Sequence, residues 1–127
     1  MRVVDRLQTA EGLATLAEAL AVVQERGDRR DEAELHRLEG EFLLQQAVPS
    51  EPQAETCFRQ ALDIARRQQA KSLELRAAVS LSGLWQQQGK WDAARDLLAP
   101  IYGSFTEGFD TVDLKKARAL LDELSAS

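Results

Sequence analysis

Few side chains in this 127-residue chain have the chemistry of a catalytic group or a metal ligand. His36 is the only histidine, and no second ligand stands at a helical spacing that would let both bind one metal ion. Cys57 is the only cysteine, and Arg59 is the nearby cation that could activate its thiol. We expect His36 to occupy a packing position in a helix and Cys57 to be a buried, inert thiol.

Five carboxylates lie close to His36 in the sequence: Asp31, Glu32, Glu34, Glu39 and Glu41. Acid–base catalysis needs such groups in a paired geometry inside a pocket that excludes water. Nothing in the sequence supplies either condition, so we interpret the five as a solvated helix face. The sequence therefore predicts no enzyme, no cofactor and no metal site.

Two tryptophans, Trp85 and Trp91, flank Gly89. An exposed aromatic pair at a turn could anchor a partner protein. Trp85 takes a large apolar position of its helix, so we predict that it belongs to the core. Trp91 has two open interpretations, packing within a helical hairpin or an exposed contact.

Composition and charge exclude several classes of protein. With 44% hydrophobic and 29% charged residues, the chain is too apolar for disorder, and it lacks an apolar run long enough for a membrane span. A formal net charge of −5 argues against a nucleic-acid partner. A single cysteine cannot form an internal disulfide, and the charged residues 1–7 do not resemble a signal peptide. We expect a cytoplasmic protein with no membrane association.

Apolar residues recur at steps of three and four, which predicts an all-α fold. The expected helices cover residues 9–25, 30–46, 51–68, 72–88, 91–102 and 111–124. Ser50 and Gln53 have the spacing of a capping box, and Asp110 is the expected cap of the last helix. We expect a solvent-facing side on that helix, made by Asp113, Lys115, Lys116 and Glu123.

One pattern of small and large apolar residues occurs three times. It begins at Gly12, Ala54 and Ala94, at intervals of 42 residues (12 to 54) and 40 residues (54 to 94). The copies are Gly12-Leu16-Ala19-Leu20, Ala54-Phe58-Ala61-Leu62 and Ala94-Leu98-Ile101. Such a period indicates a helical repeat. We predict one domain over residues 1–127, with a half repeat (9–26), two repeats (30–69 and 71–106) and a capping helix (110–125).

The unit from residue 75 to about 108 resembles a tetratricopeptide repeat. It carries Ala78, Leu81, Ser82 and Trp85, then Gly89, then Ala94, Leu98 and Ile101. The preceding unit carries His36, Gly40, Leu43, Ala54, Phe58 and Ala61, with a turn two residues longer. The resemblance implies a tetratricopeptide-like α-solenoid of about six antiparallel helices.

Longer strings, at residues 34–41, 61–78 and 102–114, resemble the C-terminal repeat region of large bacterial signalling proteins. Those proteins join a cyclase or DNA-binding regulator domain to an ATPase domain and then to tetratricopeptide repeats. No catalytic motif of that family occurs here. The resemblance implies a fragment of a larger protein that acts as a non-catalytic scaffold for a protein, a peptide or neighbouring domains.

In tetratricopeptide arrays the first helix of each pair lines a concave groove. The resemblance places nine residues there: Glu34, Arg37, Glu41, Gln45, Arg76, Val79, Gly83, Gln86 and Gln87. An alternative is that this groove is simply solvated. A second functional hypothesis is self-association, in which two copies form a homodimer by stacking through the apolar face of the first helix, near Leu13, Leu16 and Leu20.

Overall fold

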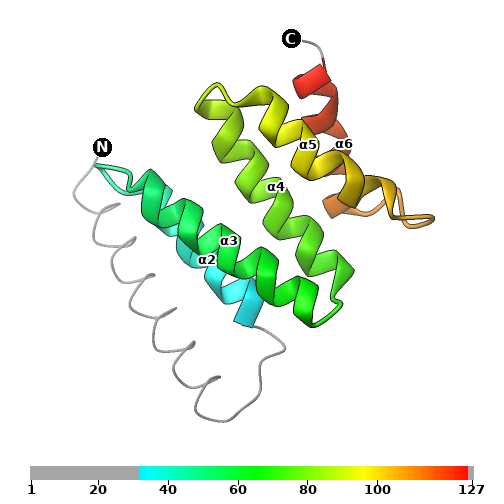
Figure 1. Cartoon of the computed structure of the whole chain (residues 1–127), viewed down its shortest axis with the longest axis horizontal. Helices are drawn as coiled ribbons and strands as arrows, with labels where there is room; N and C mark the ends of the chain where they lie inside the picture. Colours follow the sequence, from blue (N-terminus) through cyan, green and yellow to red (C-terminus); the bar gives the residue numbers. More distant parts are fainter. Residues whose placement is uncertain (1–31, 126–127) are drawn as a thin grey trace.

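A computed structural model describes residues 32–125, and within that range the regular structure is entirely α-helical (Figure 1). The helices are α2 (Glu32–Leu44), α3 (Glu51–Arg67), α4 (Lys71–Gln87), α5 (Trp91–Gly103) and α6 (Val112–Ser125). The predicted all-α class is therefore confirmed for this part of the chain. The expected helix over residues 9–25, the first copy of the repeated pattern and the proposed stacking surface lie outside the described residues.

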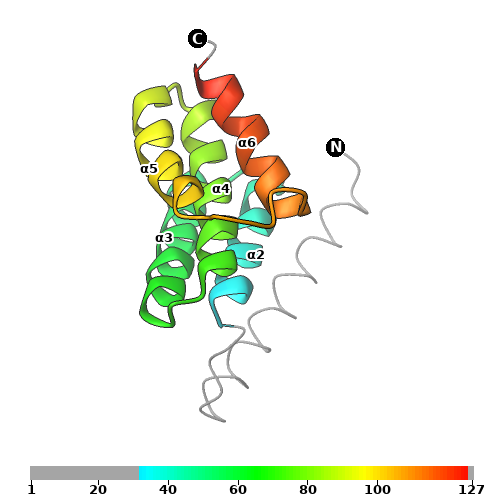
Figure 2. The same ribbon diagram turned by 90° about the vertical axis from the view of Figure 1, so that its right-hand side faces the viewer.

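The helices form two layers. Each helix packs against the next one along the chain, and α4 also contacts α2 and α6. Figure 2 shows α2, α4 and α6 together, with α3 and α5 on the other side of α4. Among the described helices the backbones of α3 and α5 do not lie side by side, so α4 is the element that packs against all the others. This consecutive packing is consistent with a helical repeat.

The repeated pattern marks the core. All seven of its residues on α3 and α5 are buried: Ala54, Phe58, Ala61, Leu62, Ala94, Leu98 and Ile101. The small residues allow adjacent helices to approach closely, and one such approach is at Gly40. A Cβ atom there would lie 2.6 Å from Cε1 of Phe58 and 3.1 Å from the carbonyl oxygen of Ala54. Gly40 therefore provides the space that the Phe58 ring occupies.

The turns after α3 and α4 share one geometry. After α4, Gly89 has φ +80°, and the Lys90 N–H donates to the carbonyl of Trp85 at 2.8 Å. After α3, Gln69 has φ 55°, and the Ala70 N–H donates to the carbonyl of Ala65 at 2.9 Å. Both turns close the helix end with a left-handed residue, the position that glycine usually takes. At the first turn that residue is a glutamine.

Two of the expected caps are wrong. Ser50 stands at the N-terminus of α3, but its side chain makes no capping hydrogen bond, so the predicted capping box does not form. The cap of α6 is Thr111 and not Asp110, since the Leu114 N–H donates to Thr111 Oγ1 at 3.4 Å. The reason is a turn that precedes the helix. The Thr111 N–H donates to the carbonyl of Gly108 at 2.9 Å, which leaves Asp110 inside the turn.

Candidate binding groove

A groove of about 390 Å³ runs along the face formed by α2, α4 and α6. Seven of the nine residues that the resemblance placed in a groove line it: Glu34, Arg37, Glu41, Arg76, Val79, Gly83 and Gln87. They come from sequence positions more than thirty residues apart, on α2 and α4. Beyond the Cα of Gly83 the space is open, because a Cβ there would meet no heavy atom within 4 Å.

The other two predicted residues lie outside this groove. Gln45 follows the last residue of α2 and is exposed, because the helix ends at Leu44 and not at residue 46. Gln86 is on α4, but its side-chain amide donates to Glu123 Oε2 on α6 at 3.0 Å. Its side chain therefore bridges α4 and α6 beyond the groove lining.

Sequence reasoning missed five lining residues: Leu44, Ser80, Leu84, Asp113 and Lys116. Ser80 and Leu84 follow Arg76 at steps of four, so helical periodicity could have identified them. Asp113 and Lys116 were expected on a solvent-facing side of the last helix. Asp113 is half-buried, so that expectation is wrong for it, whereas Lys116 is exposed as expected and still lines the groove, because α6 packs against α4. No local signal in the sequence indicates this contact.

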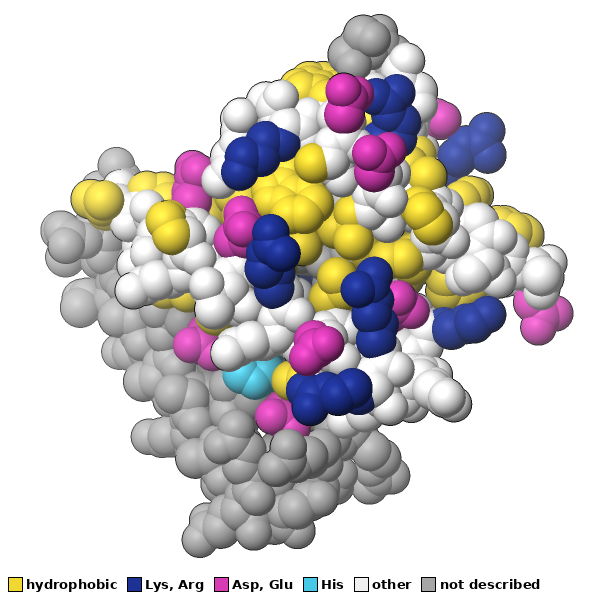
Figure 3. All heavy atoms as spheres, viewed as in Figure 1, with side chains coloured by type: hydrophobic (Ala, Val, Ile, Leu, Met, Phe, Trp, Pro, Cys, Tyr) yellow, Lys and Arg dark blue, Asp and Glu magenta, His cyan; other side chains and the backbone are white. Residues whose placement is uncertain are grey.

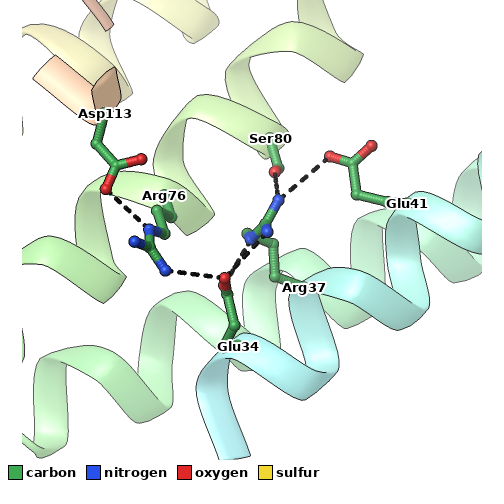
Figure 4. Close-up of polar contacts among 6 residues, drawn as sticks. All are labelled: Glu34, Arg37, Glu41, Arg76, Ser80 and Asp113. Atoms are coloured by element: carbon green, nitrogen blue, oxygen red, sulfur yellow. Dashed lines mark hydrogen bonds and ion pairs between the residues drawn. The ribbon is translucent and has the colours of Figure 1, made fainter. Parts of the chain in front are cut away.

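A network of ion pairs crosses one end of the groove (Figure 4). Arg37 donates to Glu34 through Nε at 2.6 Å and Nη2 at 3.1 Å, and its Nη1 donates to Ser80 Oγ at 3.4 Å. Arg76 donates through Nη1 to Glu34 Oε2 at 3.0 Å and through Nε to Asp113 Oδ2 at 2.8 Å. The hydrogen bond to Asp113 and the charges of both carboxylates raise the pKa of Arg76. Arg76 therefore links α4 to both neighbouring helices of its layer.

The groove offers mixed chemistry. Glu34, Glu41 and Asp113 supply negative charge, while Arg37, Arg76 and Lys116 supply an equal number of positive groups. The ammonium of Lys116 makes no hydrogen bond or ion pair with the described residues. Apolar contact area comes from the half-buried Leu44 and Val79, above the buried Leu84. Such a surface suits a segment that has both charged and apolar side chains.

His36 lies beside one of its neighbouring carboxylates on α2. His36 is half-buried, with Nε2 lying 3.8 Å from Glu32 Oε1. The described part of the chain contains no group of three residues that could hold a metal ion. The expected solvated face is wrong for Glu32, which is buried, and Glu34 and Glu41 are half-buried in the groove. Glu39 is half-buried as well, and Asp31 lies outside the described residues.

The thiol of Cys57 is buried on α3, as expected. Burial, with a smaller contribution from the charge of Glu39, raises its pKa to about 11. A thiol with this pKa stays protonated at neutral pH and is a poor nucleophile. Arg59 does not activate it, because the guanidinium of Arg59 binds Glu55 and lies over the ring of Trp85.

Trp85 is half-buried instead of fully enclosed. Its ring packs against the core, and its indole Nε1 donates to Glu55 Oε1 at 3.0 Å. That hydrogen bond, aided by Arg59, lowers the pKa of the Glu55 carboxyl although partial burial opposes the shift. Trp91 is also half-buried, at the first position of α5.

No protein-family model, curated protein or solved structure matches the chain. Within the described residues, no helix has both the length and the apolar character needed to cross a membrane.

Proposed function

We propose that this chain is a tetratricopeptide-like scaffold whose α2–α4–α6 groove binds a segment of a partner protein, a peptide or a neighbouring domain. In this proposal the chain is non-catalytic, cytoplasmic and part of a larger bacterial signalling protein with an ATPase or cyclase domain. The groove recognises its partner through complementary shape and charge.

One observation carries the proposal. Seven residues chosen from repeat register alone come together along a single groove, although they belong to two helices that are not consecutive. A two-layer helical array commonly uses such a face for binding, since one set of alternate helices supplies its whole surface. The interleaved charges of Glu41, Lys116 and Arg37 favour a peptide with side chains of both signs.

The experiment is a selection of peptides from a random phage-displayed library on the immobilised chain. Enriched peptides are synthesised, and their dissociation constants are measured by calorimetry. We expect Lys116→Glu and Gly83→Leu each to weaken binding by about tenfold or more, through charge reversal and through filling of the open space.

The matched controls are Lys115→Glu and Ala93→Leu. Both residues are exposed on helices, and neither lines the groove. These variants should bind the selected peptides like the wild type. The proposal would be contradicted if the library yields no enriched peptide. It would also be contradicted if the selected peptides bind both groove variants as tightly as they bind the wild type.

A further inference from the structure

The three helices of the α2–α4–α6 groove run in the same direction, so residues can be matched by level across it. Hydrogen bonds between neighbouring helices join residues that advance together: Glu34 with Arg76 and Arg37 with Ser80, then Arg76 with Asp113 and Gln86 with Glu123. The offset is 42 or 43 residues from α2 to α4 and 37 residues from α4 to α6. These offsets place Lys116 level with Val79, and Glu41 level with Gly83, about 6 Å further along the groove.

The charged side chains at the Arg76 end of the groove already bind one another. Glu34 accepts three hydrogen bonds, two from Arg37 and one from Arg76. Arg76 also donates to Asp113. A partner that bound these groups would have to replace hydrogen bonds that already exist, and such an exchange adds little affinity. We call Glu34, Arg76 and Asp113 the closed half of the groove.

Two charged side chains beyond the closed half keep free hydrogen-bonding capacity. Glu41 accepts no hydrogen bond from the described residues, and its ion-pair partner, Nη1 of Arg37, is 3.9 Å away. Arg37 is held instead by its two hydrogen bonds to Glu34, and Figure 4 shows the second oxygen of Glu41 directed away from it. The ammonium of Lys116 has no partner among the described residues, and it can donate three hydrogen bonds.

The space between these two side chains lies over a glycine. Glu41 is on α2 and Lys116 is on α6, and the backbones of these helices do not lie side by side because α4 separates them. A Cβ atom at Gly83 of α4 would meet no heavy atom within 4 Å. Glycine at such a position allows the backbone of a ligand to approach closely. A segment that lies along α4 here has Glu41 on one side and Lys116 on the other. We call Glu41, Gly83 and Lys116 the open half of the groove.

We propose that the open half binds a segment with an acidic and a basic side chain, and that each wall recognises one sign of charge. The acidic side chain binds Lys116 on α6, and the basic side chain binds Glu41 on α2. This inference rests on the proposed peptide-binding function and specifies the chemistry of the partner. Each charged group of the open half gains a hydrogen-bonded partner of opposite sign when the segment covers it.

The same arrangement rejects segments that carry charges of one sign. A segment with two acidic side chains would place one of them against Glu41. A segment with two basic side chains would place one of them against Lys116. Both contacts bring like charges together, which disfavours the wrong partner. Glu41 and Lys116 are therefore the residues that determine specificity in this groove.

The test exchanges the two charges and leaves the net charge unchanged. In the swapped variant, Glu41→Lys with Lys116→Glu, each wall carries the sign of the other. Peptides are selected from the random library on the wild type, and calorimetry measures their dissociation constants for both proteins. We expect the swapped variant to bind these peptides about tenfold more weakly or worse. Peptides resynthesised with every acidic residue replaced by lysine and every basic residue by glutamate should prefer the swapped variant by a similar factor.

The control variant is Asp96→Lys with Lys115→Glu. It makes the same exchange at two exposed residues that do not line the groove, so it should bind both sets of peptides like the wild type. Circular dichroism confirms that each variant is folded. Should the swapped variant not fold, Lys116→Glu alone should prefer peptides whose acidic residues are replaced by lysine.

The outcomes distinguish this inference from the proposed function. Selected peptides that bind Gly83→Leu weakly, but bind the swapped variant as tightly as the wild type, would overturn the inference and leave the groove as the binding site. Selected peptides that lack one sign of charge would overturn it as well. A library that yields no peptide would overturn the proposed function and this inference together.

Discussion

Gly40 and Gly83 occupy helices of the same layer, yet their surroundings are opposite. A methyl group at residue 40 would meet the Phe58 ring, which is fully buried, whereas one at residue 83 would meet nothing within 4 Å. We expect Gly40→Ala to lower the free energy of unfolding by about 1–3 kcal/mol, because the core is overpacked. Gly83→Ala should raise it by about 0.5–1 kcal/mol, because alanine favours a helix. Urea denaturation measures both values, and equal effects would contradict this account of Gly40.

The buried thiol of Cys57 gives a prediction for reactivity. Its pKa of about 11, against 9.0 for an ordinary thiol, leaves little thiolate at pH 8. We expect Ellman's reagent to react slowly with the folded chain and rapidly in urea. Fast labelling of the folded chain would mean that the reagent reaches the Cys57 thiol and that the thiol is not buried.

The same pKa makes stability depend on alkaline pH. The Cys57 thiol holds its proton more tightly in the folded state than in the unfolded state. Its contribution to the free energy of unfolding is therefore complete below pH 9.0 and is lost as pH rises toward about 11. A Cys57→Ala variant should lose less stability over that interval than the wild type, as measured by urea denaturation at each pH.

The ends of α3 and α4 share one geometry, but the end of α3 uses an unusual residue. Gln69 has φ 55° at the position where the next turn has Gly89 with φ +80°. A side chain in this left-handed conformation costs about 1–2 kcal/mol. Gln69→Gly should therefore raise the free energy of unfolding by about 1 kcal/mol. Gln68→Gly is the control, since Gln68 has φ −83° and glycine should only weaken that helix end. A Gln69→Gly variant that is less stable than wild type would refute this reading.

The position of α6 depends partly on Arg76. This side chain joins α4 to Asp113 on α6 and to Glu34 on α2, but it is 41% exposed, so solvent screens both pairs. We expect Arg76→Met to cost about 0.5–1 kcal/mol and to speed hydrogen exchange in α6. Lys115→Met, at an exposed position of α6 that makes no ion pair with the described residues, should leave exchange there nearly unchanged. Equal exchange in the two variants would show that Arg76 does not hold α6.

Sequence periodicity predicts helices well and contacts between distant helices poorly. The steps of three and four predict where α3, α4 and α5 lie, and the repeated pattern predicts their buried residues. The cap of α6 was missed because a turn at Gly108 shifts it to Thr111. Asp113 was missed as a groove residue because its partner, Arg76, lies 37 residues away. Such a contact depends on how two helices pack, which their own sequences do not encode locally.

At the scale of the whole molecule, the two layers present two different surfaces. The α2–α4–α6 face is a groove of interleaved charges cross-linked by Arg76. The face between α3 and α5 has a hollow with an apolar floor and charged side chains of both signs, Arg59, Asp63 and Arg66, on its wall (Figure 3). Because α4 contributes to both, a change in its packing would alter the two surfaces together.

The central place of α4 also determines what fluorescence would report. The two tryptophans of the sequence, Trp85 and Trp91, lie on α4 and at the start of α5. Their emission therefore reports on the hairpin formed by α4 and α5, whereas circular dichroism at 222 nm averages over every helix. Since α4 contacts all the other described helices, we expect both signals to change at the same urea concentration. Separate midpoints would show that α2 and α3 unfold independently of the hairpin that carries the tryptophans.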